Sequence, residues 1–379
     1  MAMEKPARNE AVDFWRGLAL VMIFINHIPD NPLTHLTLRR WGMADSAEIF
    51  VFLAGVTAAM TIGRRFDRNG LRAGLIYCLR RIWRLFCAHI MLVFGLLAIV
   101  AWAGRYIDSA PVKQQFNFLP FFLDLDRALV KLVHFAYMPS MTDILPLYIV
   151  MLVLFPLFWL LRRRSWWLPV LLSGAVWLYA SGFGFAPNEH PPELIWQFNP
   201  LAWQFIFMLG MALHDRKDRL LALLRNKIWV VAAAAIVMFG FLAAAPWVIR
   251  PEHESWRVIP PQILRYDNKI DLSLLRLLDF LALCFLSVRF WPQISARTPM
   301  IIRRVLCLLG RNALLVFSAG TLLSLTFYLM QRHFGLGNAG YIIFSLAGIA
   351  MMAALAYSAD AIRRFQRAEL LPSGAVVVS

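Results

Sequence analysis

The chain has 379 residues, of which 60% are hydrophobic and only 16% are charged, and its mean hydropathy is +0.62. A soluble domain has about 25% charged residues, so this composition excludes a soluble globule, and the apolar content excludes a disordered chain. The class that remains is an all-α polytopic integral membrane protein in a lipid bilayer.

The net charge of +16 raises the question of a nucleic-acid partner. The basic residues, however, occur in short clusters between apolar runs, which is typical of topology signals and not of a continuous basic face. We therefore expect no nucleic-acid partner. The four cysteines lie in or beside apolar runs and show no Cys/His metal spacing, so no metal is expected either.

Ten segments approach the length of about 20 mostly apolar residues that a membrane-spanning helix needs. We expect them to form a single transmembrane domain over residues 1–379. The predicted spans are residues 11–28, 47–63, 83–103, 143–161, 166–183, 198–213, 228–249, 274–290, 306–330 and 340–362.

The orientation of these spans follows from the positions of Lys and Arg, which favour the cytoplasmic side. With the N-terminus in the cytoplasm, the cytoplasmic segments hold 24 Lys and Arg residues and the outer segments hold 11. Ten spans with both termini in the cytoplasm are therefore predicted. The residues from about 104 to 142 then form a long outer segment.

The first span carries polar residues that the bilayer disfavours by about 2.5–3.5 kcal/mol per charge. Asp13 and Arg16 are three residues apart and can pair on one helix face. Arg16 and His27 are eleven apart, which places them on one face and roughly 16 Å apart along the axis. With Asn26 and Asp30 they predict a polar track. The alternatives are an Arg16 anchor at the inner interface and a His27 wetted by the first outer loop.

Glu48 opens the second span, a short loop after His27. A carboxylate beside a histidine can orient the ring and stabilise its protonated form, which suits a general base. An acid in the first turn of a helix is also favoured by the helix dipole, so a purely structural role for Glu48 stays open.

Three arginines, Arg80, Arg81 and Arg84, precede or open the third span, and His89 follows inside it. Arg81 and Arg84 share a helix face, and the planar guanidinium fork is suited to phosphate. A simple positive-inside cluster explains the same residues. Further along, Arg276 and Asp279 form an i, i+3 pair that structural pairing explains well.

The sequence resembles the OpgC family in residues 13–19, 26–29, 31–33, 37–39 and 47–55, and is also similar to it in residues 143–148 and 198–204. Members of this family are integral membrane proteins implicated in succinylating osmoregulated periplasmic glucans. The wider acyltransferase-3 superfamily has an Arg/Lys-x10-His pattern, which matches Arg16 and His27. Its Arg-x-x-Arg pattern, associated with the acyl-CoA donor, matches Arg81 and Arg84.

The resemblance implies a multi-pass enzyme of the bacterial inner membrane whose active site is reached from both sides. An acyl-CoA donor, with succinyl-CoA favoured, would come from the cytoplasm, and a periplasmic glucan would accept the acyl group. The donor would dock on Arg80, Arg81 and Arg84, with His89 nearby, and its pantetheine arm would pass Arg16.

At the reacting end, His27 would act as general base, with Asp13 and Arg16 on the same track. Glu48, or else Asp30, would hold the imidazole, and Asn26 is a candidate oxyanion donor. On the acceptor side, Arg39 or Arg40 would pair with a succinyl carboxylate and Trp41 would pack against a sugar ring. The other expected substrate-binding residues are Asn199, Trp203, Gln204 and Arg276.

Several alternatives stay open at this point. The same chemistry could move acetyl onto another glycan, and transfer could be direct or pass through an acyl-enzyme. A transporter or flippase could use the same polar track as a path, and a scaffold could use its polar pairs only for structure. The oligomeric state is not predicted.

Overall fold

The computed structural model describes residues 9–183, 196–215, 222–244 and 268–369. All regular secondary structure in these residues is helical, so the predicted all-α class is confirmed for them. The chain divides into two compact units. The terminal unit comprises residues 1–32 and 294–379, and the central unit comprises residues 33–293.

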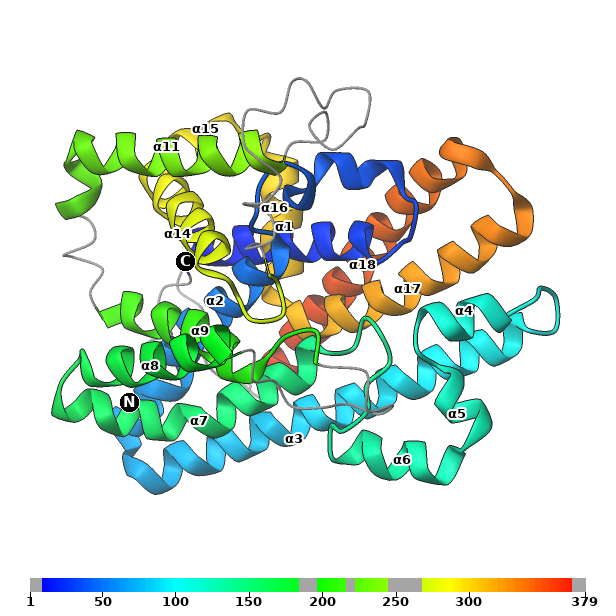
Figure 1. Ribbon diagram of the computed structural model, residues 1–379, viewed down its shortest axis with the longest axis horizontal. Helices are drawn as coiled ribbons and strands as arrows, with labels where there is room; N and C mark the ends of the chain where they lie inside the picture. The colour runs from blue at the N-terminus through cyan, green and yellow to red at the C-terminus, as the bar shows by residue number, and fades with distance from the viewer. Residues whose placement is uncertain (1–8, 184–195, 216–221, 245–267, 370–379) are drawn as a thin grey trace. The chain divides into compact units, whose positions relative to one another are not determined.

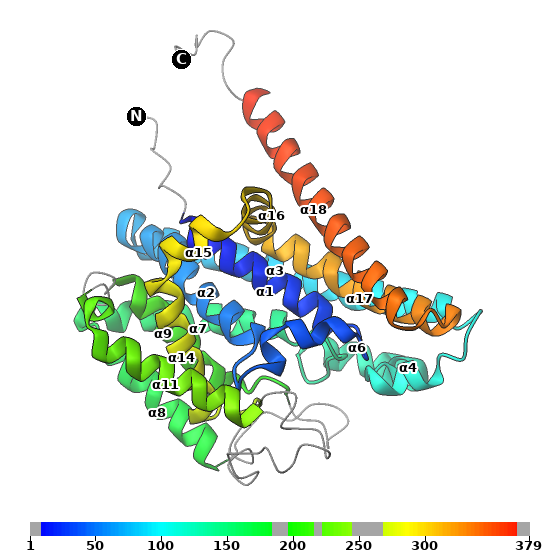
Figure 2. The same ribbon diagram turned by 90° about the horizontal axis from the view of Figure 1, so that it is seen from above.

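Helices from both ends of the chain build the terminal unit (Figure 2). They are α1 (Glu10–Asn26), α16 (Met300–Arg311), α17 (Ala313–Phe334) and α18 (Gly337–Glu369), with α15 (Trp291–Arg297) at the boundary. The Asn9 side chain caps α1 by accepting hydrogen bonds from the backbone N–H groups of Ala11 and Val12. Gly335, with φ 61°, ends α17 in the left-handed conformation that glycine adopts without strain.

Within the terminal unit, α1 and α16 meet at two glycines. A Cβ atom on Gly17 would lie 1.9 Å from the carbonyl oxygen of Leu306, and one on Gly310 would lie 1.9 Å from that of Asp13. Only glycine permits helix backbones to approach so closely, which is a recurrent packing device in membranes. Backbone therefore touches backbone where these two helices cross.

The central unit contains the remaining helices (Figure 1). They are η1 (Pro32–Leu36), η2 (Leu38–Arg40), α2 (Ser46–Ala58), the π-helical η3 (Ala59–Gly63), α3 (Arg64–Ala103), α4 (Ala110–Gln115), α5 (Leu119–Leu123), α6 (Leu125–Val133), α7 (Ile144–Arg164), α8 (Leu168–Phe183), α9 (Pro200–Asp215), α11 (Lys227–Ala244) and α14 (Leu274–Arg289).

Helices α3 and α7 run side by side and antiparallel in the central unit (Figure 1). Arg163, at the end of α7, donates to the Phe66 carbonyl at 2.9 Å, and Cys78 donates to the Leu152 carbonyl at 3.1 Å. Helix α3 is broken at Gly70, whose φ of 80° and ψ of 175° are not helical. A straight helix therefore begins after Gly70, about twelve residues before the predicted third span.

Five helices of the described chain are long and apolar enough to cross a membrane. They cover Ser46–Ala103, Ile144–Arg164, Lys227–Ala244, Ala313–Phe334 and Gly337–Gln366, and two shorter apolar helices cover Leu168–Gly182 and Pro200–His214. This supports a multi-helix membrane protein. The first of the five contains two of the predicted spans, which the break at Gly70 separates.

One predicted span is interrupted in the structure, and the segment after the predicted third span contains short helices. Residues 306–330 are not one helix, because α16 ends at Arg311 and α17 begins at Ala313. The Asn312 side chain donates to the Leu308 carbonyl there, and a hydropathy average does not register such a local turn. Residues 104–142 contain α4, α5 and α6, and apolar side chains from this segment pack on α3 around Val93.

The glycine crossing generates a stability prediction. Gly17→Ala places a methyl group against a backbone oxygen that cannot rotate away, so the helices must separate. We expect a loss of about 1–3 kcal/mol in the free energy of unfolding, measured as a lower Tm of the purified protein in detergent. Gly182→Ala is the control, because nothing lies within 4 Å of a Cβ there. Equal losses in both variants would contradict the crossing.

Candidate functional site

The predicted polar track lies on α1 in the terminal unit. The helix is continuous from Glu10 to Asn26, and His27 follows as its C-cap residue with right-handed helical dihedral angles. Arg16 and His27 are eleven positions apart and are therefore separated by about 16 Å along the helix axis. Arg16, Asn26 and His27 are all half-buried, as is Asp13. The helix thus carries the track at the spacing that the sequence implied.

Packing in the terminal unit holds the end of α1 that carries His27. The Ser324 hydroxyl donates to the Phe24 carbonyl at 3.0 Å, and the Asn31 side chain donates to the Ser345 hydroxyl at 2.9 Å. The His27 ring lies edge-on to Phe317, with 6.4 Å between ring centroids. Asp30 is exposed and has a φ of 59°. His27 is therefore placed by α17 on one side and by a tied-down loop after it.

Glu48 belongs to a buried ionic network in the central unit. Its Oε1 accepts from Arg276 Nε at 2.9 Å and lies 2.8 Å from Nη2 of the same guanidinium. Its Oε2 accepts from the backbone N–H of Asp45 at 2.8 Å, which completes a capping box at the start of α2. Glu48 is fully buried and Arg276 is 6% exposed, so the pair is shielded from solvent.

Asp45 extends this network towards solvent. Its carboxylate lies 2.6 Å from Lys269 Nζ and 3.6 Å from Arg276 Nη2. Burial by itself would raise the pKa of the Asp45 carboxyl, but the two neighbouring cations hold this pKa well below its ordinary range. Two carboxylates and two cations therefore balance in charge, and only Lys269 is appreciably exposed.

Asp279 lies about one turn beyond Arg276 on α14 and holds the loop before α2. Its Oδ2 accepts from the backbone N–H groups of Met43 and Ala44, each at 3.0 Å. A Cβ on Gly240 would lie 2.8 Å from Asp279 Oδ1, so α11 approaches the carboxylate closely. Arg276 and Asp279 thus hold the first turn of α2 and the loop before it.

The three arginines of α3 do not share one environment. Arg80 and Arg84 are exposed, whereas Arg81 is half-buried and faces α7. Its Nη2 donates to the Tyr148 hydroxyl at 3.4 Å, and its guanidinium lies 5.7 Å from the centroid of that ring. The structure therefore separates the predicted phosphate cluster into two exposed arginines and one that points into the helix bundle.

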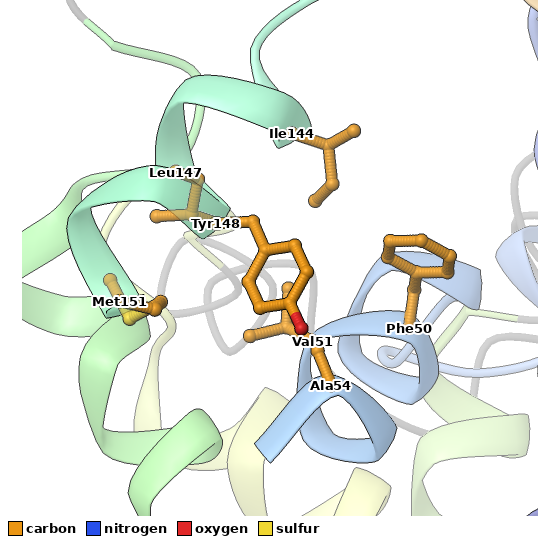
Figure 3. Close-up of a pocket in the computed structure, with 7 residues that line it drawn as sticks. All are labelled: Phe50, Val51, Ala54, Ile144, Leu147, Tyr148 and Met151. Atoms are coloured by element: carbon orange, nitrogen blue, oxygen red, sulfur yellow. The ribbon is translucent and has the colours of Figure 1, made fainter. Parts of the chain in front are cut away.

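Tyr148 also lines a small apolar cleft between α2 and α7 (Figure 3). Its phenol ring extends across the cleft towards Val51 and Ala54, and Phe50 and Ile144 stand at the other side. The other lining residues are Leu147 and Met151. Arg81 thus reaches the wall of this cleft through the hydroxyl of Tyr148.

His89 lies two turns beyond Arg81 on α3 and is fully buried. Its ring is edge-on to Phe135, with 5.7 Å between centroids. Neither ring nitrogen has a hydrogen-bond partner within the described part of the chain. The structure therefore places His89 in apolar packing beside the helices of residues 104–142.

The expected substrate-binding residues at and just before the start of α9 are buried and make internal hydrogen bonds. Asn199 donates to Asp271 at 2.8 Å, Trp203 donates to the Lys269 carbonyl at 3.0 Å, and Gln204 donates to the Ser173 carbonyl at 2.7 Å. These contacts hold α9 against α8 and the segment that carries Lys269.

The predicted acceptor residues lie in the segment before α2. Trp41 donates to the His35 carbonyl at 2.5 Å and stacks on Phe241 of α11, with 5.9 Å between centroids. Arg39 is exposed and Arg40 is half-buried. This segment therefore presents two cations and an indole next to the loop of Met43 and Ala44, which Asp279 holds.

Sequence reasoning missed three functional contacts. Tyr148 carried no signal beyond its place in a similar block, and nothing local linked it to Arg81. Lys269 and Asp45 lie 224 residues apart, and Asp279 reaches a loop 235 residues earlier. The presence of a charged residue in an apolar helix was the available signal for Asp279. Its partners are backbone N–H groups, which every residue except proline has, so the sequence could not identify them.

These features define an all-helical membrane protein with a half-buried histidine at the end of α1 in the terminal unit and three arginines on the long helix α3 of the central unit. A family model described as OpgC protein matches residues 8–364, and the chain belongs to that family. Membership implies an acyltransferase with a glucan acceptor. No curated protein and no solved structure matches the chain.

The buried ionic network generates a second stability prediction. Arg276→Met leaves the Glu48 carboxylate without its main counter-charge in a buried position, which typically costs about 3–5 kcal/mol. We expect a large fall in Tm in detergent. Arg303→Met is the control, since Arg303 pairs at 3.3 Å with the exposed Glu10, and such a pair contributes at most about 1 kcal/mol. Similar falls in Tm for the two variants would show that the buried Arg276–Glu48 pair matters no more for stability than the exposed Arg303–Glu10 pair.

Proposed function

We propose that the chain is an O-acyltransferase that moves an acyl group, with succinyl favoured, from cytoplasmic acyl-CoA to hydroxyl groups of a periplasmic glucan. The observation that carries this is the half-buried His27 at the end of a continuous helix that carries Asp13 and Arg16 near its start, in a chain of the OpgC family. The Arg16–His27 and Arg81–Arg84 spacings support a place in the acyltransferase-3 superfamily.

The proposed chemistry follows from the properties of imidazole. His27 takes the proton of a sugar hydroxyl while the oxygen attacks the thioester carbonyl, and general-base help of this kind contributes roughly 10²–10⁴-fold. The tetrahedral intermediate collapses to the ester and releases the CoA thiol, which receives the proton from His27. Asn26, which precedes His27 in the sequence, is the proposed hydrogen-bond donor to the oxyanion. Asp13 and Arg16 keep the far end of the same face polar.

A carboxylate should orient the His27 ring, and the candidates were Glu48 and Asp30. Both oxygens of Glu48 already have partners, Arg276 and the Asp45 N–H. Asp30 is exposed and follows His27 by three residues in the same unit. We therefore propose Asp30 for this role and a positioning role in the central unit for Glu48.

The proposed topology is that of a multi-pass protein of the bacterial inner membrane with ten spans and both termini in the cytoplasm. The excess of Lys and Arg in the segments that this topology places in the cytoplasm supports it. The donor approaches from that side, where the exposed Arg80 and Arg84 are suited to CoA phosphates. The glucan approaches from the other side, where Arg39, Arg40 and Trp41 are available.

The function is tested by incubating purified protein with succinyl-CoA, or separately acetyl-CoA, and a neutral periplasmic glucan. We expect mass spectrometry to show acyl addition with wild type and its loss in His27→Ala at unchanged Tm. His333→Ala, an exposed histidine of α17, is the control and should keep full activity. Acetyl addition without succinyl addition would show that the enzyme transfers acetyl instead of succinyl. Altered glucan location in cells with intact acylation in His27→Ala would favour a transporter.

The two carboxylates are separated by a further pair of variants. Asp30→Asn keeps the left-handed backbone, which asparagine tolerates, and removes only the charge. We expect kcat to fall about 10- to 100-fold without a change in Tm, as for loss of a partner that orients a histidine. Glu48→Gln should instead lower Tm, because it breaks the Arg276 pair. Full activity of Asp30→Asn would remove Asp30 from the mechanism.

A further inference from the structure

Two runs of arginine that are far apart in the sequence meet at one end of the central unit. Residues 64–72 contain four arginines, and residues 162–164 contain three. The Arg163 guanidinium donates to the Phe66 carbonyl at 2.9 Å, which joins the end of α7 to the first turn of α3. The seven arginines therefore belong to one surface, which we call the arginine surface.

The charge of the arginine surface is strongly unbalanced. Its one carboxylate, Asp67, lies 4.0 Å from Arg162 and 3.7 Å from Arg163, and it also accepts a hydrogen bond from Trp159 at 3.0 Å. The other five arginines have no carboxylate partner within the described residues. Their guanidinium groups are available to an external anion, and the planar fork of donors is well suited to phosphate.

The arginine surface lies where a candidate membrane span ends. The apolar run of α7 stops at Leu161, directly before the three arginines of residues 162–164. Trp166 and Trp167 follow, and both are exposed, as is typical of tryptophans at a membrane interface. These positions place the arginines at the level of lipid headgroups, where clusters of about four to eight basic residues bind anionic lipids.

An exposed apolar stripe of α3 begins at this surface. Arg72, Leu75 and Leu79 are spaced i, i+3 and i+7, so they share one helix face. Leu75 is 37% exposed and Leu79 is 62% exposed. A ligand that fits both parts has an anionic phosphate joined to long apolar chains. Inorganic phosphate and the CoA headgroup have no such chains, so the surface and the stripe together fit an anionic phospholipid.

We propose that the arginine surface binds the headgroups of anionic phospholipids, whose acyl chains cover the stripe of Leu75 and Leu79. The lipid phosphates supply the negative charge that the described residues do not place beside five of the arginines. Because the surface joins α3 to α7, bound lipid holds the two helices together and stabilises the central unit. This lipid site does not depend on the proposed acyl transfer.

The test uses the full-length protein, purified in a neutral detergent and stripped of lipid. Native mass spectrometry measures the Kd values of dioleoyl phosphatidylglycerol and dioleoyl phosphatidylcholine, which have the same acyl chains and differ in headgroup charge. We expect phosphatidylglycerol to bind at least about tenfold more tightly and to give the larger rise in Tm. This preference should fall in about 1 M salt, where the Debye length is about 3 Å.

Variants of both arginine runs locate the site. Arg68→Gln/Arg72→Gln removes two exposed cations without a carboxylate partner, so the Tm without lipid should stay unchanged. We expect its Kd for phosphatidylglycerol to rise roughly 10- to 30-fold, the contribution of two cations near a headgroup. Arg164→Gln, from the exposed end of α7, should raise the same Kd about fivefold. It serves if the double variant fails to fold.

The matched control is Arg105→Gln/Arg127→Gln, which removes two exposed cations from the segment that follows α3. It should leave the Kd for phosphatidylglycerol within about twofold. An equal loss in the two double variants would show that net charge, and not the arginine surface, attracts the lipid, and would overturn the proposal.

Two other results would also overturn it. Equal binding of the two lipids by wild type would show that only the acyl chains matter. Displacement of phosphatidylglycerol by inorganic phosphate or free CoA at micromolar concentration would assign the arginine surface to a soluble phosphate ligand. A preference for phosphatidylglycerol that Arg68→Gln/Arg72→Gln removes and the control keeps would support the proposal, whether or not the protein transfers acyl groups.

Discussion

The central unit depends on the neutralisation of buried charge at the start of α2. Arg276 lies between the carboxylates of Glu48 and Asp45, and each of these carboxylates also accepts a backbone hydrogen bond in the first turn of the helix. A buried pair of this kind contributes little net stability over an apolar core, but the loss of one partner is severe. The network therefore acts mainly by specifying one arrangement of α2 and α14. That arrangement also determines where the α2 wall of the cleft stands.

Arg276 and Arg81 are two inward-facing cations of the central unit that have different partners. Both belong to helices of an apolar chain, and the sequence gives no reason to distinguish them. Only the fold shows that one meets two carboxylates and the other a phenol. Because desolvation penalises both, the cation without an internal anion is the one for which a substrate anion would bring the larger gain.

Features that depend only on helical periodicity and composition were predictable from the sequence. The all-helical class follows from hydropathy, and the spacing of Arg16 and His27 on one face requires only an unbroken helix. Long-range partners are a different matter. Nothing in the local sequence of α14 indicates that Arg276 reaches a glutamate 228 residues earlier.

The positions of helix ends were equally hard to predict. The third span was expected to start at residue 83, directly after the basic cluster that contains Arg80 and Arg81. The helix instead continues from the break at Gly70, and this places Arg81 well inside it, at the level of Tyr148. At the residue where the predicted span begins, the structure has a helix interior, and the membrane boundary itself stays a prediction.

The glycine crossing of α1 and α16 also bears on the order in which the chain is assembled. Because α16 is synthesised almost 300 residues after α1, the terminal unit cannot close until the whole central unit has been made. The central unit lies between them in sequence and has all its own helices available beforehand. During biogenesis, α1 must therefore wait without its native neighbour α16, a period in which insertion factors or chaperones have access to it.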